Sequence, residues 1–152
     1  MLNGWQINGI TTLSSGSPFN VLSNVDTNDD GILTDRPNVV GNPVIHGSRS
    51  RTDKILEYFN TTAFAVPAAN SGPGNAPRDP VIGPGFVDTD ISAFKSYALT
   101  HERSLLFRGE IYNLFNNVNL SNPDGTMGTG NFGKITGTSA PRIVQFALKL
   151  EF

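Results

Sequence analysis

The chain lacks several features by which common functional classes are recognised. It has no cysteine, which excludes disulfide bonds, thiolate metal sites and cysteine nucleophiles. No apolar run approaches the roughly 20 residues that a transmembrane helix needs, which excludes a helical membrane protein. Its lysines and arginines form no cluster, and a formal net charge of -2 argues against a nucleic-acid partner. The opening MLNGWQINGI has neither the basic region nor the apolar core of a signal peptide.

Groupings that could carry out catalysis are also missing. His46 and His101 are isolated in the sequence, and neither has an Asp or Ser partner at a recognised spacing. The glycine-rich stretch at residues 125–133 lacks the Lys-Ser/Thr pair of a phosphate-binding loop. We therefore predict that the protein is not an enzyme and that it has no catalytic residues and no resident organic cofactor.

Four segments of the chain alternate between apolar and polar residues, as strands with one apolar face do. They cover residues 4–13, 88–100, 104–115 and 142–152. The last is the most regular, and its final residue is aromatic. In the second, Phe94 and Lys95 break the alternation, which predicts a bulge or a membrane-interface position there.

The connections between these segments differ greatly in length. Residues 14–87 and 116–141 form long connections rich in Gly, Pro and Asn, whereas only a short turn around His101 joins the middle two segments. Outer-membrane barrels show this asymmetry, with tight periplasmic turns and long extracellular loops. The predicted fold class is all-β, with about four antiparallel strands of an outer-membrane β-barrel and long extracellular loops, located in the bacterial outer membrane.

In a membrane barrel, one strand face meets lipid and the other meets the lumen. The apolar face is predicted to contact lipid through Phe107, Ile111, Val144, Phe146, Leu148, Leu150 and Phe152. The polar face is predicted to line the lumen through Arg108, Glu110, Gln145 and Lys149. Alternation alone also fits a soluble β-sandwich, in which the apolar face covers a core.

The stretch DTNDDGILTDRP resembles a calcium loop in its spacing. Carboxylate and amide side chains occupy positions one, three and five, and a glycine occupies position six, where it permits a sharp turn. The bidentate glutamate of position twelve is absent, although an aspartate at position ten could partly replace it. The alternative is an ordinary Asp/Asn/Gly turn that needs no metal. The candidate ligands are Asp26, Asn28, Asp30 and Asp35.

Aromatic residues suggest two further roles. Trp5 and Tyr97 lie near strand ends, where an interfacial aromatic belt would place them. Tyr58 and Phe59 lie in the long connection, where they are candidates for ligand capture.

A series of short blocks resembles the C-terminal part of TonB-dependent outer-membrane receptors of the Oar-like type, which are found in acidobacteria and myxobacteria. Each block is short, but their shared order runs over nearly the whole chain. The matching blocks are SGSPF at 15–19, DRP at 35–37, FNTTAF at 59–64, DISAFK at 90–95, RGEIYNLFN at 108–116 and PRIVQFALKLEF at 141–152.

This resemblance implies a barrel of about 22 strands that is closed by a plug and imports a scarce ligand with energy passed on by TonB. The chain is then expected to be a fragment of such a receptor over residues 1–152, because four strands cannot close a barrel. Its implied partners are outer-membrane lipid, the rest of the barrel and plug, TonB through a part not in this chain, and an imported ligand. The alternative function is a secreted, calcium-dependent β-sandwich binding module.

Overall fold

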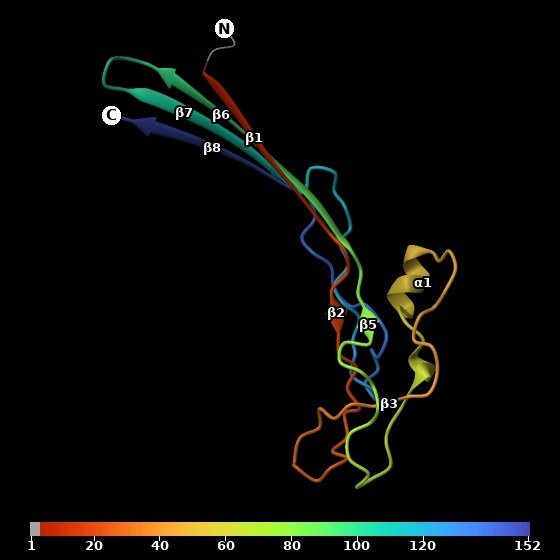
Figure 1. The fold of residues 1–152 in the computed structure, drawn as a ribbon. Coiled ribbons are helices and arrows are strands. Elements are labelled where there is room, and N and C mark those ends of the chain that lie inside the picture. Colours follow the sequence, from red (N-terminus) through yellow and green to blue (C-terminus); the bar gives the residue numbers. More distant parts are fainter. Residues whose placement is uncertain (1–3) are drawn as a thin grey trace. The chain divides into compact units, whose positions relative to one another are not determined.

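A computed structural model describes residues 4–152. Its four long strands form one antiparallel sheet in the order β1-β6-β7-β8, so each long strand pairs with the next one along the chain (Figure 1). The all-β antiparallel prediction is confirmed, and the strands fall close to the four alternating segments. They are β1 at Trp5–Ser14, β6 at Phe86–Ala98, β7 at Ser104–Tyr112 and β8 at Ile143–Glu151.

The strand register gathers residues of one character on each face of this sheet. Ile7, Ala93, Gly109 and Phe146 form one cross-strand row, and the adjacent row consists of polar residues. Because successive side chains of a strand point to opposite faces, the rows alternate between an apolar face and a polar face. The polar row is Asn8, Ser92, Glu110 and Gln145.

The pairing of β6 with both neighbours continues without interruption through Phe94 and Lys95. The predicted bulge is therefore wrong. Phe94 lies on the polar face and Lys95 on the apolar face, which is the exchange that disturbed the sequence pattern. Both side chains are accommodated by cation–π contacts, so the backbone has no need to deform.

The two ends of the sheet carry different connections. A short turn joins β6 to β7, where the backbone N–H groups of Leu99 and Thr100 donate to the carbonyl oxygen of Arg103. The start of β1 and the end of β8 lie at this same end (Figure 1), since Trp5 pairs with Lys95. Both long connections leave from the opposite end, as the asymmetry of loop lengths predicts.

Strand β7 ends at Tyr112, three residues before the end of the predicted segment. The next residue, Asn113, has a positive φ of 52° and is buried, so its backbone leaves the extended conformation. Its side-chain amide donates to the carbonyl oxygens of Asn117 and Ala140, and its backbone N–H donates to Asp90 Oδ1. The NLFNN sequence therefore forms a hydrogen-bonded turn at the rim of the sheet.

The long connections are folded, which the sequence analysis did not predict. Ser15–Gly85 and Leu120–Thr138 together form a second compact unit, which we call the loop body. Backbone hydrogen bonds join its two segments, including Tyr58 N to Gly133 O at 2.7 Å and Leu22 N to Gly125 O at 2.9 Å. Its short elements are β2 at Pro18–Phe19, β3 at Asn38–Val39, α1 at Arg51–Leu56, the 3-10 helix η1 at Thr61–Ala63, β4 at Phe64–Ala65 and β5 at Val81–Ile82.

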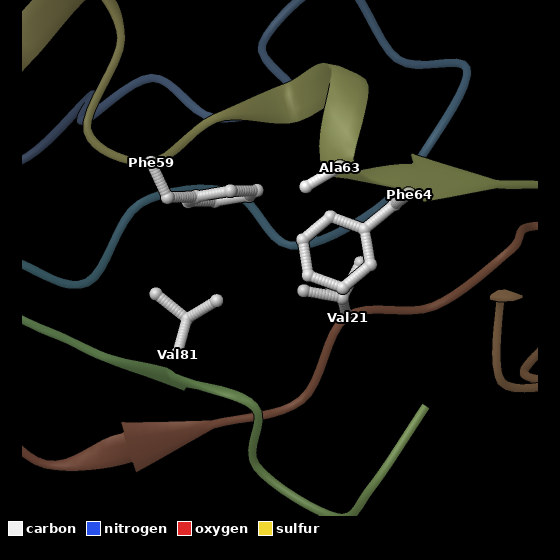
Figure 2. Packing of buried hydrophobic residues seen from close by; sticks show 5 residues of the cluster. All are labelled: Val21, Phe59, Ala63, Phe64 and Val81. Atoms are coloured by element: carbon white, nitrogen blue, oxygen red, sulfur yellow. The ribbon is translucent and has the colours of Figure 1, made fainter. Parts of the chain in front are cut away.

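Phe59 lies at the centre of the loop body's apolar core. Its side chain is 1% exposed, and its ring centroid lies 5.4 Å from that of Phe132, 5.8 Å from Phe64 and 6.0 Å from Phe19. Figure 2 shows Phe59 with Val21, Ala63, Phe64 and Val81 of the same cluster. The prediction that Phe59 captures ligand is wrong, because the core encloses its side chain; Tyr58 packs partly buried against the same cluster.

The helices of residues 4–152 are short. Helix α1 is held by a capping box, in which Ser50 Oγ accepts from Asp53 N and the Asp53 carboxylate accepts from the Ser50 backbone. No helix in this part of the chain is long and apolar enough to cross a membrane.

Candidate membrane and lumen surfaces

The apolar face of the sheet is uncovered. Phe146 is 71% exposed and Leu148 is 67% exposed, although both lie in the middle of β8. Leaving such surface in water costs about 25 cal/mol for each Å² of apolar area, so this face requires an apolar environment outside the chain. The face carries six of the seven residues predicted to contact lipid, and Phe152 follows β8 with 94% exposure; the six are Phe107, Ile111, Val144, Phe146, Leu148 and Leu150.

The opposite face brings together the four residues predicted to line the lumen. Arg108 and Glu110 form an ion pair, and Gln145 lies directly across from Glu110 on β8. Lys149 Nζ donates to Glu151 Oε1 at 2.8 Å on the same face. A charge facing lipid costs about 2–4 kcal/mol at the bilayer midplane, so paired charges on this face fit a surface turned away from lipid.

Two residues of β6 are exceptions to this separation of polar and apolar faces. An aromatic ring lies on the polar face beside a cation, and a lysine lies on the apolar face beside two aromatic rings. On the polar face, the Arg108 guanidinium lies 5.2 Å from the centroid of the Phe94 ring. On the apolar face, Lys95 Nζ lies 5.0 Å from the Trp5 ring centroid and 4.9 Å from that of Tyr97. The cost of a lysine facing lipid falls to about 0–1 kcal/mol near the membrane interfaces, where tryptophan and tyrosine also gather. This arrangement favours the interface alternative for Lys95.

The candidate calcium loop in the loop body is closed by its first aspartate. Asp26 Oδ2 accepts from Gly31 N at 2.8 Å, and Asp26 Oδ1 accepts from the backbone N–H groups of Asn28 and Asp30. These hydrogen bonds, led by that from Gly31, lower the pKa of the Asp26 carboxyl below its ordinary value. Asp29 and Gly31 have φ values of 60° and 82°, which give the loop its sharp turn.

The fourth candidate ligand has a different partner. Asp35 Oδ2 accepts from both the backbone N–H and the hydroxyl of Thr27, each at 2.7 Å, and Thr27 is fully buried. Across residues 4–152, no three His, Asp or Glu side chains gather closely enough to hold a metal ion. The structure thus brings Asp26, Asn28 and Asp30 together, and it engages Asp35 in fixing the base of the loop.

Comparison with known families identifies the type of protein. The family described as outer membrane beta barrel domain matches residues 1–145. The chain belongs to this family. No curated protein and no solved structure matches it. The protein is therefore an outer-membrane β-barrel domain, and the predicted location in the outer membrane is confirmed.

Family membership and the uncovered sheet face together overturn the β-sandwich alternative. A sandwich would cover Phe146 and Leu148 with its own core, whereas both are mostly exposed in the barrel domain. The face that would be a core in a soluble protein is left uncovered in this one.

Several of the sequence blocks prove to be packing elements of the loop body. In DRP, Arg36 donates to the carbonyl oxygen of Ala76 at 3.2 Å and Pro37 is fully buried. In FNTTAF, the Asn60 side chain caps η1 between two buried phenylalanines. The residues of these blocks therefore maintain the shape of the loop body.

Within residues 4–152, neither histidine belongs to a group of side chains that could hold a metal ion. His46 Nε2 lies 3.3 Å from Asn42 Nδ2 in the loop body. His101 lies in the short turn, on the wall of an open hollow of about 350 Å³ that Phe152 and Glu151 also line.

Proposed function

We propose that this barrel domain belongs to a TonB-dependent outer-membrane receptor of the Oar-like type, which captures a scarce ligand and imports it through a plugged barrel. In this proposal the four strands are one sector of a larger barrel. Support comes from the order β1-β6-β7-β8, which leaves β1 and β8 at the edges of an open sheet, whereas a closed barrel needs at least about eight strands. The remaining strands, a plug, TonB and outer-membrane lipid are the partners, and the protein carries out no bond chemistry.

The observation that carries the proposal is the folded loop body. Both of its segments are inserted in the connections that leave the sheet opposite the short turn, which is the extracellular side in outer-membrane barrels. Extracellular loops are long in outer-membrane barrels generally, so the folding of these connections, and not their length, supports a receptor. A body with its own aromatic core around Phe59 offers a stable surface on which exposed polar groups can recognise a ligand.

The polar sheet face has a second role in this proposal. In a plugged barrel, Arg108 and Glu110 would contact the plug or border the path that opens when the plug rearranges. The alternative is that their ion pair only keeps two charges out of lipid, as their position on one face also allows.

The test is energy-dependent uptake. Cells that produce the protein are offered labelled ferric siderophores, glycans and peptides, before and after the inner-membrane proton gradient is dissipated. We expect saturable uptake of one ligand class, lost with the gradient and lost in cells that lack TonB. Uptake that stays proportional to concentration and is insensitive to the gradient would instead identify a passive pore.

A further inference from the structure

Lys95 is the one charged residue on the apolar face of the four strands. The acidic residues of these strands, Asp88, Asp90, Glu110 and Glu151, all occupy positions of the opposite face. Among residues 4–152 the two ion pairs are Arg108 with Glu110 and Lys149 with Glu151, so Lys95 has no carboxylate partner there. An ammonium with three donors and no protein anion is left on a surface that meets the membrane.

The position of Lys95 along β6 determines how deep in the membrane this residue lies. It lies three residues before the end of β6, which corresponds to about 10 Å along the strand, and it pairs with the first residue of β1. This end carries the short turn, which is periplasmic in outer-membrane barrels. A lysine at this depth extends its ammonium group toward the headgroups, where Trp5 and Tyr97 also belong.

We propose that Lys95, Trp5 and Tyr97 form a binding site for the phosphate group of an anionic phospholipid in the periplasmic leaflet. The two rings lie 5.0 and 4.9 Å from Lys95 Nζ and hold it in place. The phosphate supplies the missing negative charge. The next row of the same face, further from the short turn, is Ile7, Ala93, Gly109 and Phe146, so the acyl chains below a bound headgroup meet apolar side chains.

The choice of a lipid over free phosphate follows from these surroundings. A soluble anion would use only the ammonium group, whereas a phospholipid also covers the exposed rings of Trp5 and Tyr97, which are 45% and 52% exposed. The inference rests on membership of the barrel family and is independent of TonB-dependent import.

The chain contains one tryptophan, Trp5, which reports directly on this site. The complete barrel to which this chain belongs, with Trp5 as its single tryptophan, is refolded into phosphatidylcholine bilayers that contain a small equal fraction of either brominated phosphatidylglycerol or brominated phosphatidylcholine, with bromine near the headgroup end of the acyl chains. We expect the anionic lipid to be enriched about fivefold beside Trp5, which is the effect of one lysine at a membrane surface, and therefore to quench its fluorescence more strongly. Added salt should reduce the difference.

Variants separate the site from general charge. Lys95→Gln should abolish the lipid preference and Lys95→Arg should retain it, whereas Lys149→Gln on the opposite face should leave it unchanged. Equal quenching of the unaltered chain by both lipids would overturn the proposal, even if Lys95→Gln fails to insert. Inorganic phosphate added to the chain in detergent should not alter Trp5 fluorescence; a response that reproduces the lipid effect would exclude the phospholipid as the specific ligand.

Discussion

The sheet and the loop body are built on opposite principles. In the loop body, the buried residues are mainly hydrophobic and gather around Phe59. In the sheet unit of residues 4–152, the buried residues are polar, and every large hydrophobic side chain is exposed or half-buried. These buried polar residues are Glu110, Asn113 and Asn119. The loop body therefore excludes water from an apolar centre, whereas the sheet leaves its apolar side chains on an uncovered face, as a strand face that meets lipid does.

The two units are also stabilised differently. Regular pairing between neighbouring long strands satisfies the backbone of the sheet inside its two edges, β1 and β8, and lipid demands such pairing of any strand that it surrounds. The loop body has only two-residue strands, one short α-helix and one 3-10 helix. Many of its backbone N–H groups are instead bonded by Asp, Asn and Ser side chains, as Asp26 and Ser50 show. Substitutions should therefore affect one unit and leave the other intact.

The largest expected effect is the loss of Phe59. Phe59→Ala should destabilise the loop body by about 3–5 kcal/mol, because three aromatic rings and the aliphatic core lose their central partner. Limited proteolysis of residues 15–85, with hydrogen exchange, measures the loss. The exposed Phe115, outside the loop body, provides the control as Phe115→Ala. Equal protection of the loop body in both variants would contradict the assigned core.

The second-largest effect is expected from a charge added to the apolar face of β8, compared with one added to its polar face. Phe146→Arg should destabilise membrane insertion by about 2–4 kcal/mol if its row lies near the bilayer midplane. Gln145→Arg, one residue earlier on the polar face, should cost much less. The fraction of folded chain in lipid bilayers, followed against urea, compares the two. If Gln145→Arg proved the more damaging variant, the assignment of the two faces would be reversed.

A smaller effect is expected from a glycine contact within the loop body. A Cβ atom at Gly16 would lie 1.7 Å from the carbonyl oxygen of Gly83, and backbone on that side must move. Gly16→Ala should therefore cost about 1–3 kcal/mol, as other overpacked sites do. Gly130→Ala is the matched control, because an added Cβ there meets no atom within 4 Å. Proteolytic half-lives of the loop body report the difference, and equal half-lives would argue against the close approach.

The sheet could be predicted from the sequence because its pattern is local. Alternation over about ten residues determined the four strands and the two faces, and the faces agree with the register in β7 and β8. The sequence showed that Phe94 and Lys95 break the alternation, but it did not show which contacts allow this arrangement. It depends on Trp5, Tyr97 and Arg108, which come from three strands and meet only in the folded sheet.

The loop body could not be predicted because its contacts are long-range. Phe59 contacts Phe132, which lies more than seventy positions later in the sequence. The strands of the loop body are too short to show an alternation of apolar and polar residues. A signal was present in the FNTTAF block, whose two phenylalanines are unusual in an exposed loop. The calcium spacing brought Asp26, Asn28 and Asp30 together as expected, while the hydrogen bonds that Thr27 donates to Asp35 depend on a turn that spacing does not specify.

Low pH should destabilise the loop body selectively, without any substitution. The pKa of Asp53 is lowered mainly by the Ser50 hydroxyl, and that of Asp26 by the Gly31 N–H. At Asp124 partial burial acts in the raising direction, but hydrogen bonds from Thr129 and Thr126 lower the pKa. Each folded pKa lies below the ordinary value of 3.8, so the stabilisation is complete above that pH and is lost as the pH falls through the folded values.

Hydrogen exchange at decreasing pH, corrected for intrinsic rates, should therefore show protection lost from the loop body below about pH 4. Asp53→Asn removes one of these ionisable groups, and it should make the protection of α1 lower at neutral pH and less dependent on pH. Unchanged pH dependence in that variant would show that the Ser50–Asp53 capping box does not contribute to the acid response.

The smallest expected effect is that of calcium on the loop at residues 26–31. Asp26 Oδ2 accepts a hydrogen bond from Gly31 N, and a carboxylate oxygen can accept two, so a cation can share this site with the backbone. With two carboxylates and no glutamate at position twelve, binding should be in the weak range of extracellular modules, and millimolar calcium should stabilise the loop body by only about 1 kcal/mol. Calorimetry with calcium, using magnesium and Asp30→Asn as controls, measures it. Absence of heat at millimolar calcium would leave the ordinary Asp/Asn/Gly turn as the full account of this loop, because its hydrogen bonds already close it without metal.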